Sequence, residues 1–167
     1  MIRYRPPQRR GSPYITAEGY EKLRREYQEL WNTRSSVTHA LSAAAAEGDR
    51  SENAEYIYRK KQLRELDRRI HYLQKRLEEL RVVRDLPTDR NRVFFGAWVT
   101  LEDQDSGEHV TYRIVGPDEF NPDTGWISMD APLARALLKK SLDDEVTLER
   151  PNGNKSYFIV AIRYHEP

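Results

Sequence analysis

The sequence predicts an α+β protein in which a long antiparallel helical hairpin precedes a small sheet-and-helix domain. Three observations predict it. Apolar residues recur every three or four positions in the first half of the chain, and the period changes to two from Phe94 onward. Only 38% of the 167 residues are hydrophobic. This share is too low for one large core, but it suits an elongated, solvated element joined to a modest globule.

The composition excludes several classes of protein. A formal net charge of +1 predicts no strongly charged partner for the chain as a whole. The absence of cysteine excludes disulfides, zinc ribbons and a thiol nucleophile. The four histidines are too scattered to form a metal site. No apolar run is long enough for a membrane span or a signal peptide, so we expect a cytoplasmic protein with no membrane partner.

The first helix follows an N-terminal tail. Residues 1–13 contain prolines and arginines without apolar periodicity, so we expect a disordered basic tail there. Thr16 is a candidate N-cap, and Tyr20 begins the apolar stripe of the helix. The second helix has a clearer pattern, because its apolar residues alternate spacings of three and four, as in a coiled-coil seam. These residues are Leu63, Leu66, Ile70, Leu73, Leu77 and Leu80.

The two helices are expected to pair antiparallel, because only a short turn joins them. Pairing Tyr20 with Leu77 makes the numbers of facing residues add to about 97, which places the tip at Gly48. The coiled-coil hairpin would then occupy residues 14–85, with its tip at 47–53. Each arm of about 28 residues would extend roughly 40 Å.

The remaining chain is expected to form the second domain. Residues 86–95 are a linker, and five segments with a period of two within 96–167 indicate strands. One short helix follows Asp130, which can cap it, and Pro132 fits its first turn. The three tryptophans, Trp31, Trp98 and Trp126, are expected to be packing residues.

The turn at the tip carries more carboxylates than a turn needs. Asp49, Glu52 and Glu55 crowd onto one helical turn, where like charges repel mildly. Helix capping is one explanation, because Asp49 and Glu52 have the spacing of a capping box and Ser51 is a competing N-cap. The other explanation is Mg²⁺, which prefers hard oxygen ligands. Two carboxylates could complete a metal site whose other ligands belong to another protein.

The motif "GDRSENAEY" (Gly48–Tyr56), at the apex of a coiled coil, closely resembles the tip of the Gre transcript cleavage factors of bacterial RNA polymerase. The stretches "FFGAWV", "YRIVG" and "APLARALLKK" resemble the C-terminal domain of the same family. The resemblance runs from about Ile15 to the C-terminus, and "FFGAW" with the basic second helix is similar to the GreB branch. It implies an FKBP-like second domain at 96–167 that docks on the polymerase.

The resemblance also implies a function. The hairpin would enter the secondary channel of a backtracked polymerase and stimulate Mg²⁺-dependent hydrolysis of the extruded RNA by the polymerase active centre, which rescues arrested complexes. Asp49 and Glu52 would hold the shared Mg²⁺, and Ser51, Asn53 and Tyr56 would support them. The factor would not itself be an enzyme, and it would bind no metal stably alone. We expect a monomer whose partners are bacterial RNA polymerase and the 3′ end of backtracked RNA.

Two other functions stay open at this point. A protein of the Gre fold could enter the channel and inhibit the polymerase, although the retained carboxylates argue against this. The hairpin could also be a passive coiled-coil interaction module whose tip is only capped.

The second helix is locally basic. Eight basic and two acidic side chains lie between Ile57 and Arg76, which gives this stretch a formal charge of +6. A solvated coiled-coil flank is one explanation. The other is a surface that follows the phosphates of single-stranded RNA. The candidate RNA-binding residues are Arg59, Lys60, Lys61, Arg64 and Arg68.

Overall fold

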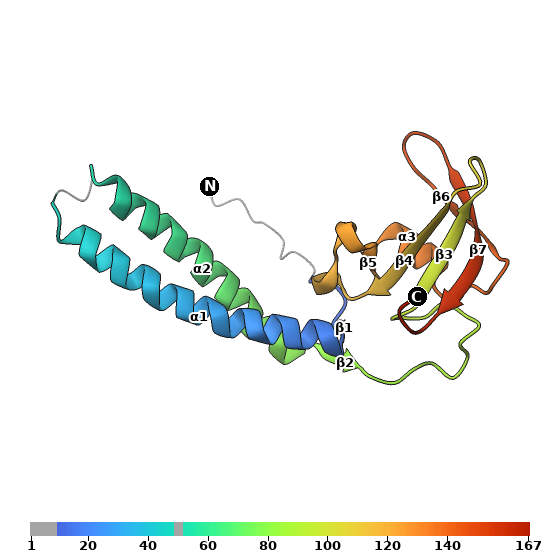
Figure 1. Cartoon of the computed structure of the whole chain (residues 1–167), viewed down its shortest axis with the longest axis horizontal. Helices are drawn as coiled ribbons and strands as arrows, with labels where there is room; N and C mark the ends of the chain where they lie inside the picture. Colours follow the sequence, from blue (N-terminus) through green and yellow to red (C-terminus); the bar gives the residue numbers. More distant parts are fainter. Residues whose placement is uncertain (1–9, 49–51) are drawn as a thin grey trace, which may run out of the picture. The chain divides into compact units, whose positions relative to one another are not determined.

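The structure is a computed structural model that describes residues 10–48 and 52–167. The chain divides into two units, a helical hairpin over Glu18–Leu80 and a sheet-containing unit that includes Arg81–Pro167 together with the residues before Glu18. Figure 1 shows the two long helices and the curled sheet that follows them. No helix among the described residues is long and apolar enough to cross a membrane.

The hairpin consists of α1 (Ala17–Ala45) and α2 (Ala54–Glu79), which lie side by side in Figure 1. Two hydrogen bonds fix their register. The Tyr20 hydroxyl donates to the Leu77 carbonyl at 3.4 Å, and the Asn53 side chain donates to the Ala44 carbonyl at 2.7 Å. In both pairs the residue numbers add to the predicted value. The antiparallel register predicted from the apolar pattern is therefore confirmed from the base of the hairpin to its tip.

An apolar seam holds the two helices together. Leu23, Val37 and Ala44 of α1 are buried, as are Ile70 and Leu73 of α2. Ion pairs flank this seam: Arg34 bonds to Asp67 at 2.6 Å, and Arg69 bonds to Glu26 at 2.7 Å. Because exposed ion pairs contribute only about 0–1 kcal/mol each, the buried seam supplies most of the stability of the hairpin.

The second unit is built on a five-stranded sheet with the order β5-β4-β3-β7-β6. The pairs are antiparallel except β4 with β5, which is parallel. The strands are β3 (Trp98–Asp103), β4 (His109–Val115), β5 (Trp126–Ser128), β6 (Glu145–Leu148) and β7 (Lys155–Arg163). Two short 3₁₀ helices, η1 (Pro117–Glu119) and η2 (Pro122–Thr124), connect β4 to β5.

The helix α3 (Pro132–Leu137) covers the core of this unit. Val99 and Leu101 alternate with more exposed residues along β3, as the period of two predicts, and both are fully buried. They cluster with Ile114 of β4, Ile159 of β7 and Leu137 of α3. The predicted sheet-and-helix domain is confirmed by this core.

A second, two-stranded sheet is formed by the segments that precede α1 and follow α2 in the chain. Strand β1 (Tyr14–Thr16) pairs in parallel with β2 (Arg81–Val83), so the chain segments before α1 and after α2 lie together within the sheet-containing unit. The sequence predicts a hairpin over 14–85, which includes both of these three-residue strands. A strand of three residues has too few positions to show a period in the sequence.

The disordered tail predicted over residues 1–13 is too long, because Ser12 has defined hydrogen bonds. Ser12 donates its amide to the Asp130 carboxylate at 2.8 Å, and its hydroxyl bonds to the same group. Asp130 therefore does not cap α3, contrary to the prediction; the N-cap is Ala131. With Pro132 at the first helical position, Asp130 lies one residue too early to cap the helix. Residues 1–9 lie outside the described residues.

The residue before α1 is anchored by a buried carboxylate. Glu119 accepts the Thr16 amide at 3.1 Å, the Thr16 hydroxyl and the Gly116 amide at 2.9 Å. Thr16 directly precedes α1, the position at which the sequence predicts an N-cap, and its hydroxyl donates to Glu119, 103 positions away. Gly116 is required here, because a Cβ at this position would lie 1.9 Å from the Tyr14 carbonyl oxygen.

Candidate functional site at the hairpin tip

The first helix ends just before the tip. The Ala46 amide bonds to the carbonyls of Ser42 and Ala43 at 3.3 and 3.2 Å, and the Glu47 amide bonds to the Ala44 carbonyl at 3.2 Å. Gly48 then adopts a φ of +140°, which glycine reaches without steric cost. The turn therefore begins where the apolar register of the sequence placed the tip.

Asn53 closes both helices at the tip. It is the N-cap of α2, and its side-chain oxygen Oδ1 accepts a hydrogen bond from the Tyr56 backbone amide at 3.1 Å. Its side-chain NH₂ donates to the Ala44 carbonyl in the last turn of α1. One side chain thus satisfies an unpaired donor at the start of one helix and a carbonyl near the end of the other.

The capping explanation for Glu52 is wrong. Because α2 begins at Ala54 with Asn53 as its N-cap, Glu52 precedes the cap and cannot occupy the third helical position of a capping box. The proposed capping residues Asp49 and Ser51 lie outside the described residues. Helix capping therefore gives no reason for a carboxylate at position 52.

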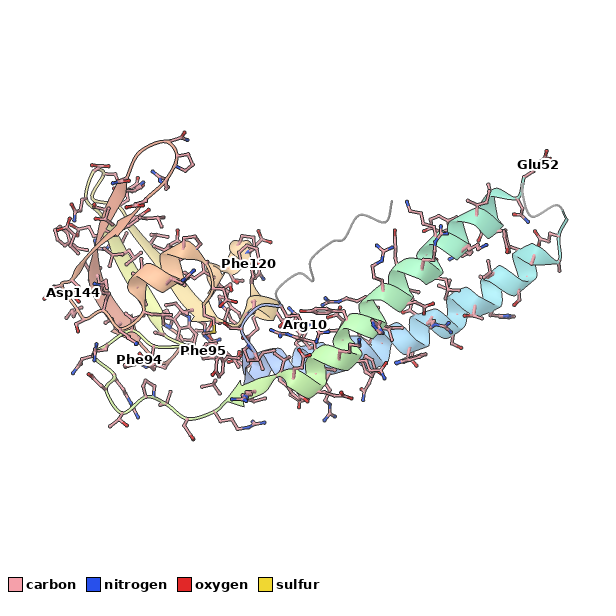
Figure 2. All side chains as sticks on the ribbon, turned by 180° about the vertical axis from the view of Figure 1, so that it is seen from behind. Arg10, Glu52, Phe94, Phe95, Phe120 and Asp144 are labelled. Atoms are coloured by element: carbon pink, nitrogen blue, oxygen red, sulfur yellow. The ribbon has the colours of Figure 1, made fainter. Side chains whose placement is uncertain are left out.

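Glu52 is exposed at the end of the hairpin, as Figure 2 shows. Within the described ranges its carboxylate has no hydrogen-bond or ion-pair partner. Glu55 differs, because its carboxylate bonds to the Arg59 guanidinium at 2.8 Å. Of these two carboxylates, Glu52 is the one available to an external ligand.

The donor chemistry of the tip suits a shared hard cation. Carboxylate oxygens are ligands that Mg²⁺ prefers, and proteins usually hold this ion with one or two carboxylates plus other ligands from water or substrate. Among the described residues, no group of three or more His, Asp or Glu side chains could hold a metal. The Glu52 carboxylate is therefore an oxygen ligand of the kind that such an ion uses, but it is not by itself a metal site.

Tyr56 is part of the tip structure. Its amide bonds to Asn53, its side chain is half-buried, and the Lys60 ammonium lies 5.8 Å from the centroid of its ring. These contacts indicate that Tyr56 helps to position the first turn of α2.

The predicted basic residues differ in how accessible they are. Arg59 bonds to Glu55 and, at 3.1 Å, to Gln62, and it is half-buried. The other four candidates are exposed on α2: Lys60, Lys61, Arg64 and Arg68. In the described part of the chain, none of these four has an acidic partner. The helix therefore presents a positively charged surface from which Arg59 is partly withdrawn.

The packing role expected of the tryptophans is wrong for Trp31. Its side chain is 46% exposed on α1. Trp98 and Trp126 are half-buried in the second unit, where their rings enclose the Arg113 guanidinium at 4.0 and 4.7 Å. The heptad pattern places Trp31 beside the seam but does not say which way its large ring points, and so sequence analysis missed its exposure.

The second unit presents apolar side chains to solvent. Phe120, which follows η1, is 59% exposed, and Leu142 is 50% exposed. Figure 2 labels Phe120 in this unit, as well as Phe94 and Phe95, which are half-buried. Exposed aromatic side chains of this kind are candidates for contacts with a protein partner.

Replacing Asn53 with alanine is expected to loosen the tip, because the change removes an N-cap and leaves the Ala44 carbonyl without its side-chain donor. Loss of an N-cap costs about 1 kcal/mol. Amide hydrogen exchange at Tyr56 should accelerate severalfold, while exchange near Leu73 should not change. Asn53→Asp keeps the cap acceptor but loses the donor, and should give an intermediate rate. Equal exchange in all three proteins would contradict this role.

Comparison with known proteins identifies the family. Residues 13–82 match the family model described as transcription elongation factor, N-terminal, and residues 87–164 match the one described as transcription elongation factor, GreA/GreB, C-term. The chain is 58% identical over 165 residues to a transcription elongation factor GreB of Xanthomonas axonopodis pv. citri, covering 98% of each protein. It is 59% identical to the one of Pseudomonas aeruginosa, with the same coverage. The chain belongs to the GreA/GreB family of transcription elongation factors, in its GreB branch.

Proposed function

We propose that this chain stimulates transcript cleavage by bacterial RNA polymerase. The hairpin enters the secondary channel of a backtracked polymerase, and the tip reaches the active centre, where the extruded RNA is hydrolysed. The observation that carries the proposal is the exposed Glu52 carboxylate, which lies at the tip, outside the helix cap, without a partner among the described residues.

The tip residues act together in this proposal. Asp49 and Glu52 would hold, through their carboxylate oxygens, a Mg²⁺ that the polymerase also binds, and Ser51 would support them. The ion would polarise the scissile phosphate and lower the pKa of its water ligand. Asn53 and Tyr56 hold the carboxylates in place, because Asn53 links the ends of both helices and Tyr56 bonds to Asn53.

The chain is a cofactor of the polymerase and not an independent nuclease. Two neighbouring carboxylates do not make a complete metal site, so catalysis needs ligands from the polymerase. The factor acts as a monomer, with the polymerase and the 3′ end of backtracked RNA as its partners. The second unit docks on the polymerase, and Phe120 is a candidate for this contact because of its exposure.

The decisive experiment adds the full chain and Mg²⁺ to a stalled, backtracked elongation complex whose RNA is labelled. Short RNAs derived from the 3′ end should appear, and the chain should release none from the same RNA without polymerase. A channel-binding inhibitor would slow RNA extension without producing them, and a passive interaction module would do neither. Either result would contradict the proposal.

The exposed basic surface is expected to matter most for long extruded RNA. Replacing Lys60, Lys61, Arg64 and Arg68 with glutamine removes four phosphate-binding charges. Cleavage in deeply backtracked complexes should fall about 10-fold or more, with a much smaller loss in complexes backtracked by one or two nucleotides. Arg59→Gln alone should have little effect, because Arg59 already pairs with Glu55.

A matched control neutralises cations at the other end of the hairpin, at the exposed Lys22, Arg24 and Arg25. This variant should cleave both kinds of complex as the wild type does. An equal loss in shallow and deep complexes for the α2 variant would contradict RNA binding by this surface.

A further inference from the structure

The first helix carries a hollow that neither the tip mechanism nor the seam explains. Its volume is about 400 Å³. The lining residues recur every three or four positions along one face of α1: Trp31, Arg34, Ser35, Thr38, His39 and Ser42. The hollow therefore runs along α1, from Trp31 toward the tip of the hairpin.

Trp31 is held in place while nearly half of its side chain stays exposed. Its ring meets the Tyr27 ring edge to face, with centroids 6.4 Å apart and an interplanar angle of 89°. The Arg34 guanidinium lies 5.8 Å from its centroid. An exposed aromatic ring with a cation beside it is a common platform for a nucleic-acid base.

The lining of the hollow favours a nucleic acid over a protein. The lining contains no carboxylate and no aliphatic side chain. Apart from Trp31 and Arg34, it consists of side chains that carry a hydroxyl group or an imidazole. Trp31 and Arg34 would suit either kind of partner, because these residue types are common at protein hot spots and at nucleic-acid contacts. The hydroxyl groups distinguish the two, because serine and threonine are under-represented among the residues that dominate protein–protein binding. They do bond to the phosphates and sugars of nucleic acids. In addition, α1 has no charged residue from Ser35 to Ala46, so nothing along this face repels an anion.

The second helix places cations beside the hollow. The ion pair between Arg34 and Asp67 joins α1 to α2 on this side of the hairpin and neutralises the Asp67 carboxylate. Lys60 and Arg64 precede Asp67 by seven and three residues, so they lie on the same side of α2, nearer the tip. Both are exposed. Aromatic, hydroxyl and cationic groups are thus combined on one side of the hairpin.

We propose that this side of the hairpin binds a segment of single-stranded RNA, with one base stacked on Trp31 and phosphates contacted by Lys60 and Arg64. The source of that RNA, the strand extruded from a backtracked polymerase, rests on the proposed function. Beyond the proposed function, this proposal specifies the side of the hairpin along which the RNA lies and the residue, Trp31, on which a base stacks. Trp31 lies 17 residues before Gly48, or about 26 Å of helix, so only longer extruded strands reach it.

The test titrates the full chain into a fluorescently labelled 12-nucleotide oligouridylate at low salt and follows anisotropy. Trp31→Leu should weaken binding about 10-fold, and Trp31→Phe should weaken it less because it keeps an aromatic face. The matched control is Tyr72→Leu. Tyr72 is 39% exposed, and the Arg69 guanidinium lies 5.4 Å from its ring centroid. Arg69 bonds to Glu26 and is two residues from Asp67, so this pair lies on the other side of α2.

Salt dependence separates stacking from phosphate binding. The slope of log affinity against log salt should be unchanged in Trp31→Leu. It should fall by about 1.4 in the double variant Lys60→Gln, Arg64→Gln, since each phosphate contact in single strands contributes about 0.7. Circular dichroism of each variant should show a folded hairpin, because Trp31, Tyr72, Lys60 and Arg64 are not part of the buried seam.

The proposal is overturned if Trp31→Leu binds the oligouridylate as tightly as the wild type, if Tyr72→Leu loses as much affinity, or if the wild type does not bind. A Trp31→Leu variant that keeps RNA affinity but loses affinity for RNA-free polymerase would identify the hollow as a protein contact instead. The outcome is independent of transcript cleavage. Trp31-dependent RNA binding without cleavage would refute the proposed function alone, and cleavage without such binding would refute this proposal alone.

Discussion

Replacing Glu52 with alanine is expected to reduce RNA cleavage in backtracked complexes by about 100-fold or more, without unfolding the hairpin. The size of the effect follows from the loss of one preorganised group at a site of charge development. The fold should survive, because Glu52 is exposed, lies before the N-cap of α2 and has no partner among the described residues. Asp49→Ala is expected to have the same effect on cleavage.

The chain offers a matched control for this change three residues away. Glu55 is also an exposed carboxylate near the tip, but it bonds to Arg59. Glu55→Ala should therefore cleave close to the wild-type rate, while Glu52→Asp, which keeps the charge on a shorter side chain, should fall between the two.

The measurement is a single-turnover cleavage rate, combined with competition against the wild type for polymerase binding. Glu52→Ala should compete as well as the wild type and fail to cleave. If it cleaves normally, the tip mechanism is wrong. If it fails to compete, or if its circular dichroism shows loss of helix, the role of Glu52 is structural.

The hairpin could be predicted in detail because its determinants are periodic. Leu63 to Leu80 alternate spacings of three and four, and the short turn between the helices selects the register in which this seam faces the stripe that begins at Tyr20. The hydrogen bond between Tyr20 and Leu77 confirms that register. The strands of the second unit follow a period of two, so the sheet could also be predicted.

The tip cap could not be predicted from local sequence. Asp49, Ser51 and Asn53 are all residues that favour an N-cap position. What distinguishes Asn53 is its second bond, to the Ala44 carbonyl of the other helix. A contact of this kind depends on the pairing of the two helices, and the side-chain amide of Asn53 can make it because an amide both donates and accepts. Local capping rules do not include it.

The anchoring of the residues before α1 was also missed, because it depends on distant partners. Thr16 bonds to Glu119 and Ser12 bonds to Asp130, and more than 100 positions separate the members of each pair. Polar residues near a chain terminus have no period that would indicate such bonds. A disordered tail and an N-cap are therefore what the sequence alone predicts.

Replacing Glu119 with alanine is expected to destabilise the sheet-containing unit by about 3–5 kcal/mol. Glu119 is 9% exposed and accepts the amides of Thr16 and Gly116 and the Thr16 hydroxyl. Each buried polar group that loses its partner costs about 1–3 kcal/mol. Thr16 is itself only 5% exposed, so solvent reaches its donors poorly once the carboxylate is gone.

The loss is measured by urea unfolding in a Trp31→Phe background, so that the fluorescence reports on Trp98 and Trp126 of the sheet-containing unit. Glu119→Gln keeps one acceptor oxygen and nearly the same volume, and should lose only about 1–2 kcal/mol. Glu108→Ala removes an exposed carboxylate from the same unit and should change the free energy of unfolding by less than about 0.5 kcal/mol.

Amide exchange at Thr16 and Gly116 should accelerate in Glu119→Ala, while exchange within the hairpin should not. If Glu119→Ala unfolds at the same urea concentration as Glu108→Ala, these hydrogen bonds do not stabilise the unit. The segment before α1 would then depend on its pairing with β2 and on the fully buried Ile15.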